Sequence, residues 1–320
     1  MSTAMLTAVS PRIDERLARG ELSANQVEGF RQFLEDVDRE LLHHRIITDN
    51  AYTRWFEKGE ASDSELKHFI KQFSVFSNQF LIASLLKVIN APTLQQARST
   101  KEILLNELGV IYRRREPASR NGHAHAQAHD SEGHAHDGDS AQAAAPVDSD
   151  REGDPELVST EGTVDGGVFR FRAAHFEWLL AIGETVGLGF DDMGKRRNGT
   201  AATLEFCDAL HRLYGAEDPQ IAEGASFAVE NWAAAGFWQE LEDGLVLIKN
   251  GRLPKLRLAF FTWHNRVEAQ HAGHTMEELE DVYFSSDFDR DRFFRGASDV
   301  LDAIAGFWDG LERDRLNRRY

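Results

Sequence analysis

The chain has 320 residues, of which 42% are hydrophobic, so it is long enough to bury a core as one large domain or two small ones. Its 53 acidic and 36 basic residues give a formal net charge of −17, which disfavours binding to nucleic acid or to an anionic membrane surface. The single cysteine, Cys207, excludes an internal disulfide and any cysteine-based zinc or iron–sulfur cluster, as is typical of a reducing compartment.

The first residues carry no basic segment followed by an apolar one, and no run reaches the ~18 apolar residues that would cross a bilayer. We therefore expect a protein of the cytoplasm that is neither exported nor inserted into a membrane.

Apolar residues recur with helical spacing along most of the chain, as in Phe69, Phe73, Phe76 and Phe80, and no segment alternates convincingly like a strand. Start signals agree, since 62–65 and 275–278 fit capping boxes and 218–219 is an Asp-Pro pair. The sequence therefore predicts an all-α fold, with helices at about 23–47, 62–90, 94–112, 170–187, 200–214, 218–241, 255–272 and 287–316.

From about residue 113 to 167 the chain turns to Ala, Asp, Ser, Gly and His, with almost no large apolar side chains. Burial cannot offset the ordering entropy of such a segment. We therefore predict a disordered, low-complexity insertion that interrupts one helical domain made of residues 1–112 and 168–320.

The insertion contains GHAHAQAHDSEGHAHDG, in which five histidines lie beside several carboxylates. Such a tract binds Zn, Ni or Cu loosely. It fits a metal-gathering loop or a tolerated low-complexity segment, and we favour the second because a flexible chain defines no coordination geometry.

A stripe of potential metal ligands follows in HNRVEAQH, where His264, Glu268 and His271 lie four and three residues apart on one side of a helix. The same segment is among the most apolar in the chain, with Phe260 and Trp263 close by. Partly buried imidazoles and carboxylates need partners, and an iron or manganese ion would satisfy all three groups at once.

The Glu-x-x-His pattern at 268–271 is the short motif of di-iron helix bundles, and it recurs at 40–43 and 65–68. A site of the ferritin kind takes two such motifs and two lone glutamates, so the three copies cannot share one site. The copy at 40–43 ends a helix, where a histidine opposes the macrodipole and has a structural role. We read His68 as a polar face position rather than a ligand.

Three further residues are candidates to complete a site around 264–271. Glu107 lies on an apolar-periodic helix in EILLNELG, Glu230 lies among aromatic and small residues in ASFAVENWAAAGFW, and His175 opens an amphipathic helix in RAAHFEWLLAIG. Each of them, taken alone, reads as a satisfied core or rim residue. The tryptophans nearby are read as core packing, although some should line a substrate cavity.

Taken together, these motifs resemble those of the haem-oxygenase-like di-iron oxidases and oxygenases: Glu107 in NELG, His175 at the start of HFEWLLAIGETVGL, a lone Glu230 and the ligand stripe at 264–271. This is the iron-containing redox enzyme family, related in fold to the PQQ-synthesis C protein and to thiaminase-like bundles. The resemblance covers about 60–110 and 168–315 and implies a bundle of about seven to eight helices.

The resemblance also implies a ligand set and a cofactor. It assigns two Fe2+ ions per chain, with positions left open for dioxygen, to Glu107, His175, Glu230, His264, Glu268 and His271. His274 is a candidate for a second-shell or rim position, and Arg266 for contact with a substrate carboxylate.

Two departures from the family pattern stand out. The family usually carries aspartate at position 268, and the longer glutamate of this chain reaches further. The insertion also separates Glu107 from His175, so that both reach one site only if the insertion loops out, at a closure cost of about a few kcal/mol.

No phosphate-binding loop, nucleophile elbow or basic aromatic surface occurs in the sequence. The resemblance implies an O2-dependent oxidoreductase of small-molecule biosynthesis, acting on an amino-acid-like or fatty-acid-like metabolite by N-oxygenation or C–H cleavage. Its partners would be this substrate, O2 and an external electron donor, with a homodimer as the default assembly. The alternatives are a non-catalytic protein that binds Zn, Ni or Fe, and a cofactorless or haem-handling protein of the same fold.

Overall fold

The computed structural model describes the backbone of residues 10–114, 159–164, 167–171 and 175–320. For some residues in these ranges the structure describes the backbone but not the side chain. These are residues 99, 102, 106, 110–114, 159–164, 167–171, 267–275 and 277–278.

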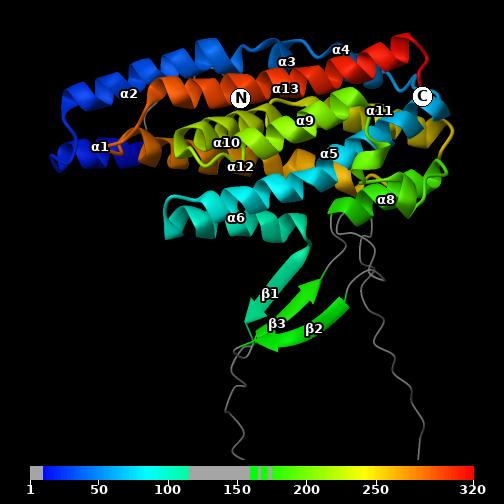
Figure 1. Ribbon diagram of the computed structural model, residues 1–320, viewed down its shortest axis with the longest axis horizontal. Helices are drawn as coiled ribbons and strands as arrows, with labels where there is room; N and C mark the ends of the chain where they lie inside the picture. Colours follow the sequence, from blue (N-terminus) through cyan, green and yellow to red (C-terminus); the bar gives the residue numbers. More distant parts are fainter. Residues whose placement is uncertain (1–9, 115–158, 165–166, 172–174) are drawn as a thin grey trace, which may run out of the picture.

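Helices make up the body of the molecule and lie side by side in a bundle (Figure 1). They are α1 (Pro11–Ala18), α2 (Ala24–Val37), α3 (Arg45–Thr48), α4 (Ala51–Phe56), α5 (Asp63–Asn90), α6 (Leu94–Glu107), α8 (His175–Thr185), α9 (Ala201–Leu213), α10 (Pro219–Ala233), α11 (Phe237–Gly251), α12 (Ala259–Tyr283) and α13 (Arg290–Leu316). A π-helical turn (Asp38–Leu42) extends α2, and two 3-10 turns (Phe190–Asp192 and Arg196–Asn198) lie between α8 and α9. The predicted all-α fold is confirmed.

The N-terminal ends of two helices follow the sequence signals. The Ser62 side chain accepts a hydrogen bond from the Glu65 backbone, and the Glu65 side chain accepts one from the Ser62 backbone, so the predicted capping box starts α5. Asp218 caps α10 through the backbone N–H of Gln220, with Pro219 at the first helical position.

Several predicted boundaries are wrong. The helix expected at 94–112 ends at Glu107, and the one expected at 255–272 continues to Tyr283. The expected helix 218–241 is broken, because Gly236 has φ +107 and separates α10 from α11. The capping-box pattern at 275–278 starts no helix, since α12 runs without interruption through these positions. Thr and Glu are also tolerated inside a helix. The pattern at 275–278 therefore does not show whether a helix starts there or has already begun.

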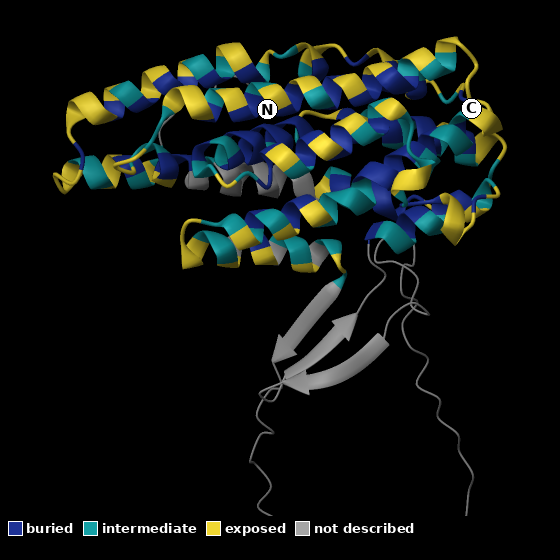
Figure 2. Ribbon diagram, viewed as in Figure 1, coloured by how far each residue is buried: buried dark blue, intermediate teal, exposed yellow. Residues whose placement is uncertain are grey.

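The helix α5 passes through the middle of the bundle, and Phe69, Ile70 and Phe73 on it are fully buried. Within the described part of the chain, only α5 is long and apolar enough to cross a membrane, with a hydropathy of 1.2 over the tested window, of which 44% is buried here. Figure 2 shows the buried residues gathered on the inward sides of α5, α9, α10 and α13. The apolarity of α5 is thus explained by its central place in the core.

A three-stranded antiparallel sheet of order β1-β3-β2 extends from the bundle beside α6 and α8 (Figure 1). It consists of β1 (Val110–Arg114), β2 (Ser159–Val164) and β3 (Gly167–Phe171). These strands correct the sequence-based predictions. No strand was expected, residues 110–112 and 170–171 were expected to be helical, and residues 113–114, 159–164 and 167 were expected to be disordered. Branched and aromatic residues at 110–112 and 168–171 favour strands, but these segments are too short to display a period. The histidine-rich tract lies outside the described residues.

Helices α10 and α13 approach each other most closely through facing glycines. A Cβ atom built on Gly224 would overlap the carbonyl oxygen of Phe293, and one built on Gly296 would overlap that of Ile221. No larger residue therefore fits at this crossing without moving the two helices apart. Because α10 also carries Glu230, the crossing helps to set the position of that carboxylate.

We expect Gly296→Ala to lower the free energy of unfolding by about 1–3 kcal/mol, because the added methyl group forces α13 away from α10. Gly306→Ala is the matched control on the same helix, since a Cβ there meets nothing within 4 Å. It should be neutral or stabilising by up to about 1 kcal/mol. Urea unfolding followed by far-ultraviolet circular dichroism measures both, and equal stability of the two variants would contradict the close contact.

Candidate metal centre

The helices α6 and α8 end and begin at the two residues that the insertion separates. Glu107 is the last residue of α6, and His175 is the first residue of α8. Between them, β1 pairs with β3 so that Val110 lies opposite Phe171, a few residues from each helix end. The insertion therefore leaves and rejoins the bundle at one place. This looping-out is what the sequence required for Glu107 and His175 to reach the same site.

The two side chains do meet. His175 Nδ1 lies 2.9 Å from Glu107 Oε2, although the residues are 68 positions apart in the sequence. The imidazole is buried, with 3% of the residue exposed, and the carboxylate is half-buried. In this geometry Nδ1–H of His175 donates to the carboxylate, which leaves the lone pair of the ring on Nε2.

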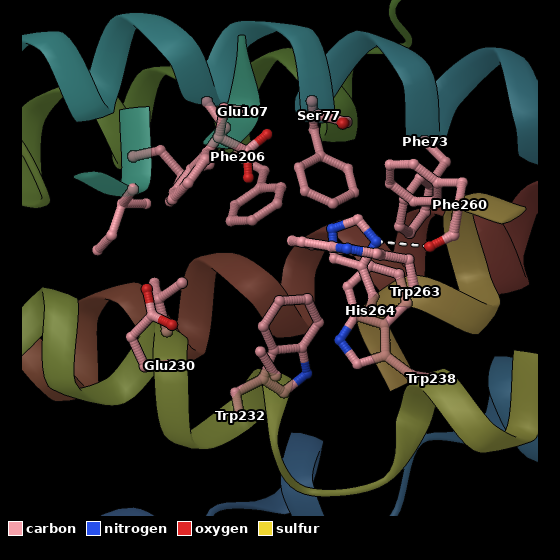
Figure 3. A pocket seen from close by; sticks show the side chains of 16 residues that line it. Phe73, Ser77, Glu107, Phe206, Glu230, Trp232, Trp238, Phe260, Trp263 and His264 are labelled. Carbon is pink, nitrogen blue, oxygen red and sulfur yellow. Dashed lines mark hydrogen bonds between the residues drawn. The ribbon is translucent and has the colours of Figure 1, made fainter. Parts of the chain in front are cut away.

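His264 of α12 completes a cluster with this pair. One potential ligand atom from each of Glu107, His175 and His264 lies within 4.8 Å of the other two. His264 Nδ1 is 2.7 Å from the carbonyl oxygen of Phe260, one turn earlier on α12, a bond drawn as the dashed line in Figure 3. The proton on Nδ1 leaves the lone pair on Nε2, and histidines that bind metals are commonly oriented in this way.

Tryptophans hold both imidazoles in place. The His175 ring stacks on Trp178 with 5.3 Å between ring centroids, and the His264 ring stacks on Trp238 at 4.3 Å. Trp263 contacts both imidazoles, at 4.6 Å from His175 and 5.0 Å from His264. The sequence predicts that these tryptophans pack in the core or line a cavity, but no spacing in the sequence indicates which one lies against which histidine.

A cavity of about 700 Å³, its open mouth included, lies next to the cluster. Most of its wall is aromatic or aliphatic, and the polar residues that line it are Ser77, Glu107, Glu230 and His264. Figure 3 shows Glu107 and Glu230 on opposite sides of this space, with Trp238 and His264 close together between the helices. The cavity is thus an apolar chamber whose few polar groups are potential metal ligands.

The six predicted ligands stand as follows. Glu107, His175 and His264 come together, and Glu230 lines the same cavity but is not part of the cluster. The side chains of Glu268 and His271 lie outside the described residues, as does that of His274, although α12 runs through all three positions. Arg266 is exposed, and no cationic side chain is among the described residues that line the cavity.

The histidines of the other Glu-x-x-His motifs lie elsewhere. His43 caps the π-helical turn and bonds the carbonyl oxygen of Asp38 at 2.8 Å, in keeping with the predicted structural role. His68 Nε2 lies 3.1 Å from Asp314 Oδ2. Desolvation lowers the pKa of His68, against the opposing effect of Asp314, so burial outweighs the ion pair there.

The donor set fits a divalent transition metal. Two imidazoles and one carboxylate with further positions open form the set that non-haem Fe(II) oxygenases use, and Mn2+ and Zn2+ accept the same donors. A separation of 4.8 Å or less between the donor atoms lets them converge on one ion after small side-chain movements. The described residues therefore hold a candidate site for one metal, beside a carboxylate, Glu230, in the same cavity.

The arrangement of the helices has counterparts among solved structures. A domain of unknown function from Shewanella denitrificans, with a haem-oxygenase-like fold, is 13% identical at a TM-score of 0.52, with 92% of this chain and 94% of that chain covered. The fold is haem-oxygenase-like. A CADD-like protein of unknown function from Nostoc punctiforme is 14% identical at a TM-score of 0.54, with 92% of this chain and 98% of that chain covered.

The sequence of this haem-oxygenase-like chain matches no protein-family model and no curated protein. At 13 to 14% identity the likeness to solved structures extends to the fold alone. The chemistry of the site is therefore inferred from the side chains of this chain and not from the similar structures.

We expect Mn2+ to stabilise the protein, because it binds the clustered ligands only when they are folded together. Metal at 100 times its Kd should raise the free energy of unfolding by about 2.7 kcal/mol. His264→Ala should lose this gain, and thermal unfolding with and without metal measures it.

His43→Ala serves as the control, because this imidazole is exposed, contacts Asp38 and is not part of the cluster. Deletion of residues 120–140 removes the histidine-rich tract and should leave the stabilisation in place. A stabilisation that survives His264→Ala but disappears with the deletion would contradict a metal centre in the bundle.

Proposed function

We propose that this protein is a non-haem iron oxidoreductase that activates O2 to oxidise a small molecule. The observation that carries the proposal is the cluster of Glu107, His175 and His264, a pair of imidazoles and a carboxylate beside a mostly apolar cavity. Bound iron supplies dioxygen activation, which no amino-acid side chain provides. A position in a haem-oxygenase-like bundle is compatible with this chemistry.

The residues of the chain have distinct tasks in this proposal. His175 and His264 would each hold the metal through a ring nitrogen, and the hydrogen bond between Nδ1 and an oxygen helps to fix each ring. The stacked Trp178 and Trp238 keep the imidazoles from rotating. The aromatic wall excludes bulk water, which would otherwise quench a reactive oxidant.

A second iron completes the proposed centre. Glu230 faces the same cavity, and Glu268 and His271 follow His264 by four and seven residues on the continuous helix α12. With these three residues as further ligands, the chain offers the mixed carboxylate and imidazole set of a di-iron bundle. We propose a stoichiometry of two Fe2+ per chain on this basis.

The lining of the cavity favours a substrate whose reacting part is hydrocarbon. Phenylalanine and tryptophan side chains form most of the wall, and no lysine or arginine is among the described residues that line it. Arg266, the predicted partner of a substrate carboxylate, is exposed. C–H cleavage in an aliphatic or aromatic group therefore fits better than N-oxygenation of an amino acid.

We further propose a cytoplasmic location, with O2, a small-molecule substrate and an external electron donor as partners. The buried thiol of Cys207, whose pKa is raised to about 12 by desolvation, is protected from reaction and consistent with a protein that needs no disulfide.

Anaerobic loading with Fe2+, followed by exposure to O2, tests the proposal. The parent should hold about two irons per chain and show an absorption change that depends on O2. Glu230→Ala and His264→Ala should bind less iron and lose the change, because each removes a proposed ligand.

The variant lacking residues 120–140 distinguishes the alternatives. A protein that only gathers metal through its histidine-rich tract would lose its iron in this variant, whereas the proposed enzyme retains both iron and response. A Soret band after incubation with haem, without any response of the ferrous protein to O2, would favour the haem-handling alternative.

A further inference from the structure

Oxidisable rings surround the two histidines of the candidate metal centre. Indole is the side chain that gives up one electron most readily after thiols and phenols, and Trp178, Trp238 and Trp263 all contact His175 or His264. Any strong oxidant formed at the cluster would therefore meet a tryptophan before other parts of the protein.

A continuous series of aromatic contacts leads from one of these tryptophans toward the surface. The Trp238 ring is 4.5 Å from Phe237, whose ring is 5.9 Å from Trp308. The Trp308 ring is 5.8 Å from Tyr52, and Tyr52 is 5.3 Å from Trp55 on α4. Trp238 and Trp308 are buried, whereas Trp55 is partly exposed.

We propose that Trp238, Trp308 and Trp55 form a path for single electrons between the candidate metal centre and the surface. This inference rests on the proposed function, because the oxygen-activated iron is the oxidant. Trp238 gives one electron to the oxidised centre and regains one from Trp308, which regains one from Trp55. A one-electron reductant in solution returns Trp55 to its resting state, so that each ring ends unchanged.

Protons need not move along this path. The indole N–H groups of Trp238 and Trp308 are buried and have no hydrogen-bond partner among the described residues, so an oxidised ring keeps its proton. Phe237 and Tyr52 provide van der Waals contact between the tryptophans, and burial raises the pKa of Tyr52 well above its usual value. Neither has to be oxidised for the electron to pass.

Close packing of the core does not by itself explain which aromatic residues occupy the route. A second series of rings starts at the cavity and runs through Phe76, Phe206 and Phe307, with centroids 5.2 to 5.5 Å apart, before it meets Trp308 at 5.2 Å. That series consists of phenylalanine, which resists oxidation. Tryptophans alternate with other rings along the route that ends at Trp55.

The first test uses the ferrous full-length protein exposed to O2 without substrate. An oxidised ring that does not regain an electron reacts further and stays oxidised. Mass spectrometry of peptides therefore records where electrons were withdrawn. We expect oxidation at Trp238, Trp308 and Trp55 in the parent. Trp308→Phe should lose oxidation at Trp55, and Trp308→Tyr, which changes the packing similarly but keeps an oxidisable ring, should restore it.

The second test needs no iron. A ruthenium(III) tris-bipyridine complex, generated by a light flash, removes one electron from exposed rings of the metal-free protein. Oxidation of the buried Trp238 should follow in the parent and in Trp308→Tyr, and it should be lost in Trp308→Phe. Circular dichroism of each variant establishes that it is folded.

The two tests separate the inference from the proposed function. An absorption change with O2 without oxidation at Trp55, or equal oxidation in the parent and in Trp308→Phe, would overturn the path and leave the function standing. Absence of any response to O2 would overturn the proposed O2-activating function. The flash experiment would still decide whether electrons pass through Trp308.

Discussion

The contact between Glu107 and His175 is the constraint on which the site depends, because it joins the ends of α6 and α8 where the chain leaves and re-enters the bundle. A half-buried carboxylate and a buried imidazole are costly apart and compatible together. Pairing of β1 with β3 brings the two helix ends together independently of the segment beyond the sheet. Loop-closure entropy grows slowly with length, so a long insertion at this place leaves the geometry intact.

Aromatic packing helps to hold the third candidate ligand. The His264 ring bonds the carbonyl oxygen of Phe260 and lies against the flat face of Trp238. Aromatic side chains lose little conformational entropy when buried and fill the space around a ring without competing for its lone pair. This packing holds the cluster together without a metal ion, and the cavity beside it keeps a mostly apolar wall.

Local signals predicted the starts of helices at Ser62 and Asp218, because helix caps and apolar periodicity depend only on residues close in the sequence. They failed for the short strands, which depend on pairing across the insertion, and at Gly236, where alanines before the glycine favour continuing the helix. For the site, resemblance to a family pointed to Glu107, His175 and His264, which do lie together. The stacked tryptophans could not be paired with their histidines, because such contacts between distant segments leave no period in the sequence.

The turn at Gly236 places Trp232, at the end of α10, and Trp238, at the start of α11, on the wall of the same cavity. The three clustered candidate ligands come from α6, α8 and α12, but Trp238 at this turn stacks on His264. Lengthening or shortening the turn would therefore reshape the floor of the chamber and also change the packing around one of the candidate ligands. The shape of the chamber and the orientation of this imidazole are thus coupled through a single loop residue, Gly236, and its neighbours.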